Sequence, residues 1–209
     1  MSSNQALLLV DIQNDFCPGG ALAVPDGDQI VSVANDLIKR TDFFDIMVAT
    51  KDWHPKDHLS FASQHQKPIG ELIKLKSINQ VLWPDHCIQD TKGAEFVDGL
   101  NPKAFDEIFK KGVNREVDSY SCFFDQDKNI STGLFDFLKI KKVEEVYLIG
   151  LAIDYCVKFS ALDSVNLGFK TIIILDGCRG VELNKGDVDK SIAEMKSEGI
   201  IISSSSEIF

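Results

Sequence analysis

Residues 145–176, EVYLIGLAIDYCVKFSALDSVNLGFKTIIILD, begin and end in short runs of β-branched and aliphatic residues. Such runs, at 145–150 and 171–176, are typical of strands that are buried on both faces of a sheet. The segment between them, 154–167, has its apolar residues at helical spacing. A strand, a helix and a strand in this order predict a right-handed crossover between two parallel strands.

The same alternation extends on both sides of this unit. Further strands are expected at 6–11, 45–50 and 199–203, and further helices at 29–41, 132–138 and 187–197. The pattern predicts an α/β fold, with a Rossmann-like, three-layer α/β/α arrangement around a mainly parallel sheet. A chain of 209 residues is within the size of one such domain, so we expect a single domain over residues 1–209.

The segment 51–118 interrupts this alternation. It contains four of the six prolines and little clear helical or strand periodicity. Long irregular segments in compact domains usually carry function. All four histidines and both tryptophans also lie in this segment, so we expect it to supply part of a functional site.

The composition is that of a globular protein, with 44% hydrophobic and 26% charged residues. A net charge of −10 disfavours a nucleic acid or an anionic membrane surface as partner and favours a small molecule. No apolar run approaches the roughly 20 residues that span a bilayer, and the amino terminus has no secretory pattern. Five cysteines cannot all pair, so reduced thiols are the simpler interpretation and a cytoplasmic location is expected.

Three of the predicted strands end in residues that suit a ligand site. The first ends at Asp11, the second at Thr50 shortly before Asp52, and the third at Gly150. In open parallel sheets, the ligand crevice lies outside the carboxyl ends of the strands. We therefore expect these three strand ends to meet at one site.

Cys156 follows the strand at 145–150 and falls in the first turn of the next predicted helix. At such a position, the helix dipole and unpaired backbone N–H groups lower the pKa of a thiol and offer donors to an oxyanion. Cys156 is therefore a candidate nucleophile, although a small buried hydrophobic residue explains its position equally well. Asp11 is the candidate base. Lys111 is a candidate charge partner, unless it is an ordinary surface lysine.

Asp52 and His54 are two residues apart, which places both side chains on the same side of an extended backbone. His86 supplies a second imidazole from the same irregular segment. One aspartate and two histidines suit a divalent ion that keeps open water positions, rather than a closed structural zinc site. The alternative is a turn in which the imidazole of His54 caps the end of a strand.

Six separated motifs make the chain recognisable. They are ALLLVDIQNDFCPGGAL at 6–22, DWHP at 52–55, WPDHC at 83–87, KG at 111–112, DSYS at 118–121 and GLAIDYCV at 150–157. Together and in this order, they resemble the nicotinamidase/pyrazinamidase family of the isochorismatase-like hydrolases. The resemblance implies a parallel sheet of about six strands between two helical layers. It also implies hydrolysis of nicotinamide to nicotinate and ammonia through a cysteine thioester.

The resemblance assigns roles to the candidate catalytic residues. Asp11, Lys111 and Cys156 match the catalytic triad of the family. The backbone N–H groups of Ala152 and Cys156 match its oxyanion hole, which accompanies a cis peptide bond between Leu151 and Ala152. No nucleotide cofactor is implied.

The resemblance also implies a metal site. Asp52, His54 and His86 match the ligands of one divalent ion, for which zinc is the first expectation and iron and manganese are alternatives. Water completes the ligand shell, and the Ser60 hydroxyl is a further candidate ligand. His58 matches a position that binds the metal in some members only, so it is left out of the predicted set.

The predicted pyridine pocket is aromatic. Phe16, Trp83 and Tyr155 match its lining residues, and Tyr120 is a further candidate. The chief alternative function is another cysteine amidase of the same superfamily that acts on a different small amide. Cys156 argues against a vinyl ether hydrolase, and the presence of every catalytic position argues against a silent binding protein. The sequence leaves open whether the protein forms a homo-oligomer.

Overall fold

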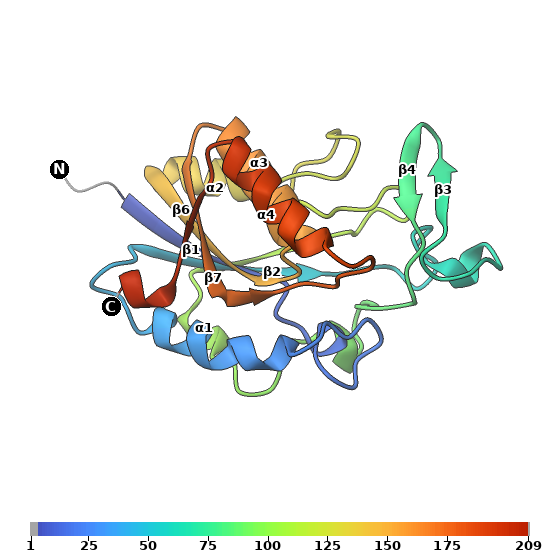
Figure 1. Cartoon of the computed structure of the whole chain (residues 1–209), viewed down its shortest axis with the longest axis horizontal. Helices are drawn as coiled ribbons and strands as arrows, with labels where there is room; N and C mark the ends of the chain where they lie inside the picture. The colour runs from blue at the N-terminus through green and yellow to red at the C-terminus, as the bar shows by residue number, and fades with distance from the viewer. Residues whose placement is uncertain (1–3, 209) are drawn as a thin grey trace.

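The computed structural model describes residues 4–208, and its centre is a six-stranded sheet in the order β5-β2-β1-β6-β7-β8 (Figure 1). Within that range, neighbouring strands of this sheet pair in parallel throughout. The strands are β1 (Asn4–Val10), β2 (Ile46–Asp52), β5 (Glu107–Lys111), β6 (Val143–Leu151), β7 (Lys170–Arg179) and β8 (Ile201–Ser203). The predicted parallel α/β sheet is confirmed.

The side chains of β1 alternate between two apolar cores, one on each face of the sheet. Leu7 and Leu9 belong to the first core, Leu8 and Val10 belong to the second, and all four are fully buried. Helix α1 (Ile30–Ile38) packs on the first face. The second face is covered by α2 (Leu134–Ile140), α3 (Cys156–Asn166) and α4 (Asp187–Ser197) (Figure 1). The protein therefore has the three layers that the alternation predicted.

The segment that lacked periodicity contains a strand of the main sheet. β5 pairs with β2 at the edge of the sheet. Most of its side chains are exposed or half-buried, Ile108 being 37% exposed, whereas Lys111 at its end is 1% exposed. Because an edge strand is not buried on both faces, β5 lacks the continuous apolar run that marks the inner strands. The surface-lysine interpretation of Lys111 is therefore wrong.

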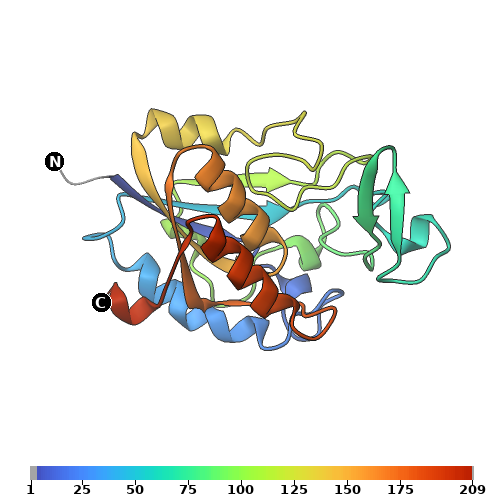
Figure 2. The same ribbon diagram turned by 45° about the horizontal axis from the view of Figure 1, so that its top comes forward.

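The same segment also forms an antiparallel hairpin of β3 (Leu72–Leu75) and β4 (Ile78–Val81). The hairpin projects from the end of the molecule that lies away from the two chain ends (Figure 1 and Figure 2). Its side chains are mostly exposed or half-buried, but Gln80 on β4 is 2% exposed. The hairpin stands at the same end as the carboxyl ends of the parallel strands, where a ligand is expected.

All five cysteines are buried free thiols, as their odd number led us to expect. In the part of the chain from 4 to 208, no helix has the length and apolar character needed to cross a lipid bilayer.

Candidate active site

Lys111 lies where the predicted strand ends meet. In the pairing of β2 with β5 it stands beside Asp52, and its side chain is buried. Its ammonium group has three hydrogens and three acceptors: Asp52 Oδ1 at 3.0 Å, the Ser119 carbonyl at 2.8 Å and Cys156 Sγ at 3.4 Å. Asp11 Oδ2 lies 2.9 Å from the same nitrogen. The expected convergence of the strand ends is confirmed.

Asp11 directly follows β1 with a left-handed backbone, φ 48°. The side chain is fully buried, and its Oδ1 accepts a hydrogen bond from Thr50 Oγ1 at 2.7 Å. The contact of Oδ2 with Lys111 is an ion pair outside hydrogen-bond geometry, so Oδ2 has no donor among residues 4–208. Burial raises the pKa of Asp11 above its ordinary value, although Lys111 opposes this. Asp11 thus combines a free acceptor oxygen with a raised affinity for a proton.

Cys156 is the first residue of α3, as predicted, and is 6% exposed. The expectation that its position lowers the thiol pKa is wrong. Burial raises the pKa of Cys156 well above its ordinary value, and the opposing attraction of Lys111 is smaller. The raised pKa favours the neutral thiol, so Cys156 needs a base when it attacks.

The backbone between β6 and α3 leaves two N–H groups unpaired. The peptide bond between Leu151 and Ala152 is cis, as expected. The N–H groups of Ile153 and Tyr155 have backbone acceptors, whereas those of Ala152 and Cys156 have none among the described residues. Ala152 and Cys156 both line the pocket described below. Their N–H groups are available to a ligand oxygen.

Asp52, His54 and His86 bring three ligand atoms within 4.8 Å of one another. The carbonyls of Gly112 and Pro84 lie 2.9 and 2.7 Å from Nδ1 of His54 and His86, respectively. Because a carbonyl only accepts, each neutral ring carries its hydrogen on Nδ1 and a lone pair on Nε2. These lone pairs face Asp52 Oδ2 at 3.1 and 3.5 Å. Three buried donors of electron pairs fit a divalent cation.

The electrostatics of this cluster also favour a bound cation. Although burial opposes the charged form of His54, Asp52 raises the pKa of its imidazole, so the cluster attracts positive charge. The buried Nε2 of His54 makes no hydrogen bond among residues 4–208, even though Asp52 is close, because a lone pair on Nε2 and a carboxylate oxygen are both acceptors. A carboxylate and an imidazole that approach without a hydrogen bond leave room for an ion between them.

His58 and Ser60 lie next to the cluster but interact with each other. The Ser60 N–H and hydroxyl lie 3.1 and 2.7 Å from Nδ1 of His58. Since an N–H only donates, Nδ1 accepts, and the ring hydrogen is on Nε2. Burial lowers the pKa of His58 to about 4, which keeps the ring neutral. In this tautomer His58 offers no lone pair to an ion beside His54, and the Ser60 hydroxyl is engaged by His58.

Asp118 is a second carboxylate near the cluster, and although it begins the DSYS motif, no role was assigned to it from the sequence. Its Oδ1 lies 3.9 Å from Nε2 of His54, and it forms a group of potential ligands with His54 and His58. It is buried and lines the pocket. The DSYS motif marks the position of Asp118 but not its role, because Asp118 approaches His54 only through the tertiary fold.

Gly112 controls how closely the chain approaches His54. Its φ is +65°, and a Cβ at this position would lie 2.4 Å from Cε1 and 2.6 Å from Nδ1 of His54. A larger residue would therefore displace the imidazole from the position in which it faces Asp52. The close approach of His54 therefore explains why the KG motif has a glycine at position 112.

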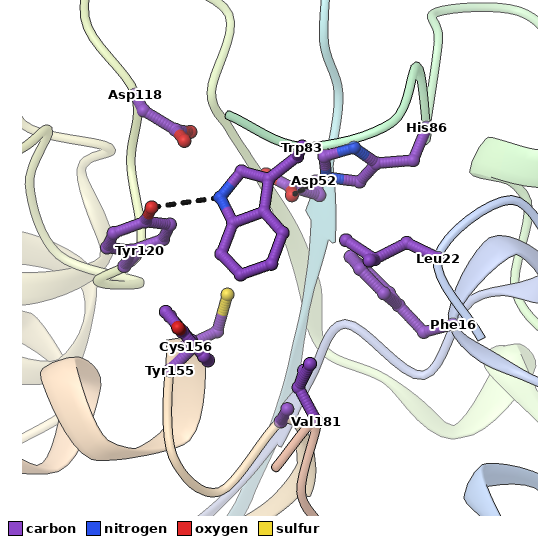
Figure 3. Close-up of a pocket in the computed structure, with 11 residues that line it drawn as sticks. Phe16, Leu22, Asp52, Trp83, His86, Asp118, Tyr120, Tyr155, Cys156 and Val181 are labelled. Atoms are coloured by element: carbon purple, nitrogen blue, oxygen red, sulfur yellow. Dashed lines mark hydrogen bonds and ion pairs between the residues drawn. The ribbon is translucent and has the colours of Figure 1, made fainter. Parts of the chain in front are cut away.

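A small pocket opens beside Cys156. The expected aromatic residues Phe16, Trp83 and Tyr155 line it together with Tyr120 (Figure 3). The rings of Trp83 and Tyr155 pack edge to face with centroids 4.9 Å apart. Such an aromatic pocket suits one small ring. The lining residues that the sequence did not single out are Leu22, Asp118 and Val181.

A family model described as isochorismatase domain matches residues 5–207. The chain belongs to the isochorismatase family. A nicotinamidase of Escherichia coli (strain K12) aligns with this protein along nearly the whole chain. It is 47% identical over 196 residues, which cover 93% of this chain and 92% of that protein.

Two solved structures show the same similarity in three dimensions. A nicotinamidase/pyrazinamidase of Acinetobacter baumanii is 42% identical with a TM-score of 0.94, and the match covers 100% of both chains. A pyrazinamidase of Pyrococcus horikoshii in complex with zinc is 36% identical with a TM-score of 0.78, and the match covers 96% of this chain and 99% of that one. The isochorismatase-family fold expected from the motifs is thus confirmed.

Proposed function

We propose that this protein is a nicotinamidase, an amidohydrolase that converts nicotinamide and water to nicotinate and ammonia in NAD salvage. We extend the proposal to pyrazinamide. The proposal rests on the surroundings of Cys156. This residue lines an aromatic pocket and contacts Lys111, which also forms ion pairs with Asp11 and Asp52. The similarity to nicotinamidases supports the choice of a small aromatic amide as substrate.

The reaction begins with attack by Cys156. Asp11 takes the thiol proton on Oδ2 while the sulfur forms a bond to the carboxamide carbon, which gives a tetrahedral oxyanion. Lys111 is held by Asp52 and the Ser119 carbonyl and contacts the sulfur, so it balances the negative charge that develops there. The N–H groups of Ala152 and Cys156 stabilise the oxyanion.

Asp11 then acts as a general acid. It returns its proton to the amide nitrogen, the C–N bond breaks, and ammonia leaves a thioester on Cys156. A water molecule gives a proton to Asp11 and attacks the thioester carbon, the C–S bond breaks, and the sulfur takes that proton back. The nicotinic acid that is released loses its remaining proton to solvent and becomes nicotinate. A raised pKa suits Asp11 for this task, because the group accepts and returns a proton in each half of the reaction.

Asp52, His54 and His86 are the residues that would hold a divalent metal ion, with zinc as the first choice. When bound, such an ion supplies a Lewis acid that attracts the lone pair of a ring nitrogen or of water. The similar pyrazinamidase is in complex with zinc, which supports a bound metal in this protein. Asp52 contacts both His54 and Lys111, so one carboxylate connects the metal ligands to the nucleophile.

Ammonia release from nicotinamide tests the proposed function. Nicotinamide and pyrazinamide should both be hydrolysed. Benzamide keeps the amide and the ring but lacks the ring nitrogen, so its kcat/KM should be lower by about tenfold to a hundredfold. A protein that releases no ammonia from nicotinamide contradicts the proposal. Equal kcat/KM for benzamide and nicotinamide would instead contradict recognition of the ring nitrogen.

Metal analysis tests the Asp52, His54 and His86 cluster. The purified protein should contain about one divalent ion per chain, as expected for a single mononuclear site. His54→Ala should lose that ion, whereas His65→Ala should keep it, because His65 binds the Leu59 carbonyl outside the cluster. Gly112→Ala should weaken the affinity for the ion by about tenfold to a hundredfold, since it disturbs the residue that orients His54. Full activity in a metal-free protein would contradict this assignment.

The alternative function is that of a cysteine amidase for another small amide. The same ammonia assay, with an N-carbamoyl amide as substrate, distinguishes it from a nicotinamidase. A single domain, a cytoplasmic location and the absence of nucleic acid and membrane partners stay predictions from the sequence. The oligomeric state stays open.

A further inference from the structure

Gln80 is a buried polar residue on a hairpin whose other side chains are mostly exposed or half-buried. It is 2% exposed, whereas its neighbour Asn79 is exposed. Gln80 belongs to none of the sequence motifs and does not line the pocket. A buried carboxamide is costly unless it is hydrogen-bonded, so its partners indicate its purpose.

The amide nitrogen of Gln80 faces three acceptors. Nε2 lies 3.1 Å from Asp118 Oδ2, 3.2 Å from the Tyr120 hydroxyl and 2.8 Å from the Val81 carbonyl. Its Oε1 accepts from Gln126 Nε2 at 3.3 Å. A carboxylate and a carbonyl only accept, so the orientation of the amide is fixed by its surroundings. Gln80 therefore ties the hairpin to two residues that line the pocket.

Tyr120 extends this connection to the pocket wall. Its hydroxyl also accepts a hydrogen bond from Trp83 Nε1 at 2.9 Å (Figure 3). The rings of Trp83 and Tyr120 both pack edge to face against Tyr155, with centroids 4.9 and 5.6 Å apart. Figure 3 shows this aromatic wall beside the sulfur of Cys156. Gln80 thus supports the wall from behind, through hydrogen bonds rather than contact with a ligand.

The nucleophile's charge partner, Lys111, does not bond directly to the hairpin. Lys111 is held by Asp52, the Ser119 carbonyl and Asp11, and within residues 4–208 none of these groups hydrogen-bonds to the hairpin. The link is indirect, because Asp118 Oδ1 accepts from the Ser119 N–H at 2.8 Å. A change at Gln80 should therefore alter how the ring is held more than how the bond is broken.

We propose that Gln80 is a positioning residue for substrate, which fixes Tyr120 and Asp118 and so sets the shape of the aromatic wall. The inference rests on the proposed nicotinamidase function. It assigns the hairpin β3–β4 a part in recognition of the aromatic ring, although none of its residues lines the pocket.

Steady-state kinetics of Gln80→Leu test the proposal, because leucine fills similar space without hydrogen bonds. KM for nicotinamide should rise about tenfold or more, while kcat should stay within about threefold of wild type. Asn79→Ala, on the same strand but exposed, is the matched control and should leave both constants unchanged. A wild-type KM in Gln80→Leu, or a loss confined to kcat, would overturn the proposal.

Two further variants keep the test decisive. Gln126→Ala removes only the bond to Gln80 Oε1, so KM should rise by about twofold to threefold, and this variant serves if Gln80→Leu does not fold. Gln80→Glu keeps the length of the side chain but sets a carboxylate against Asp118, so KM should rise at least as much as in Gln80→Leu. A Gln80→Glu variant with the wild-type KM would also overturn the proposal.

Fluorescence separates this inference from the proposed function. In a Trp53→Phe background, Trp83 is the sole tryptophan, because the chain has two. The emission of Trp83 should shift in Gln80→Leu and stay unchanged in Asn79→Ala, whatever the substrate. A wild-type protein that hydrolyses no nicotinamide would contradict the proposed function alone, whereas unchanged Trp83 emission in Gln80→Leu would contradict the positioning role.

Discussion

Replacing Cys156 with alanine should lower the turnover of nicotinamide by about 10⁴-fold or more, since loss of the nucleophile removes the covalent route altogether. The thiol contacts Lys111 at 3.4 Å and lines the pocket, but it contributes little to the fold because its side chain is small. Far-ultraviolet circular dichroism and metal content should therefore match the wild type. Cys156→Ser should retain little turnover, because a hydroxyl is a weaker nucleophile at this position.

Alkylation gives an independent measurement of the same role. Iodoacetamide should label Cys156 before the other thiols, because among the residues that the structure describes Cys156 is the cysteine that lines the pocket, and Asp11 is the base that takes its proton. Nicotinate should protect it. Cys178→Ala is the matched control, since Cys178 is also buried but lies outside the pocket, and this variant should keep its activity and its labelling. Substantial turnover by Cys156→Ala would show that the covalent mechanism is wrong.

Elements with strong local patterns were predictable from the sequence. The strands β1, β2, β6 and β7 are buried on both faces and therefore appear as continuous apolar runs. The order of strands and helices then predicts that the carboxyl ends meet, which placed Asp11, Asp52 and Cys156 near one another before any coordinates. Lys111 was a candidate charge partner whose own sequence context favoured an exposed residue, and the family motifs assigned it to the triad.

Features that arise from tertiary contact were not predictable in this way. β5 is an edge strand without an apolar run, so its pairing with β2 left no periodic signal. Asp118 and Gln80 matter because the fold brings them to the pocket wall. Burial raises the pKa of Cys156, the attraction of Lys111 lowers it and the Asp11 and Asp52 carboxylates raise it further, and only the structure shows that burial exceeds the attraction of Lys111. Sequence position alone gave the wrong sign.

Replacing Asp11 with asparagine should lower kcat/KM for nicotinamide by about 10²-fold to 10⁴-fold, the usual contribution of a general base. The change keeps the shape of the side chain and an oxygen that can accept from Thr50, so the fold should be retained. It removes the proton acceptor that the neutral thiol of Cys156 needs. Asp125→Asn is the matched control, because Asp125 is also buried with a raised pKa, but its carboxylate accepts from the Ile130 N–H and forms no ion pair with Lys111 among residues 4–208.

The dependence on pH distinguishes a base from a structural carboxylate. A base works only when it is deprotonated, so kcat/KM of the wild type should fall as pH decreases through the pKa of Asp11. Because burial raises that pKa from 3.8, the loss should occur at higher pH than for an ordinary aspartate. The low residual activity of Asp11→Asn should lack this acid limb, whereas Asp125→Asn should keep it. An Asp11→Asn variant within about tenfold of wild type, or one with an unchanged acid limb, would move the role of base to another group, since a general base contributes at least about a hundredfold.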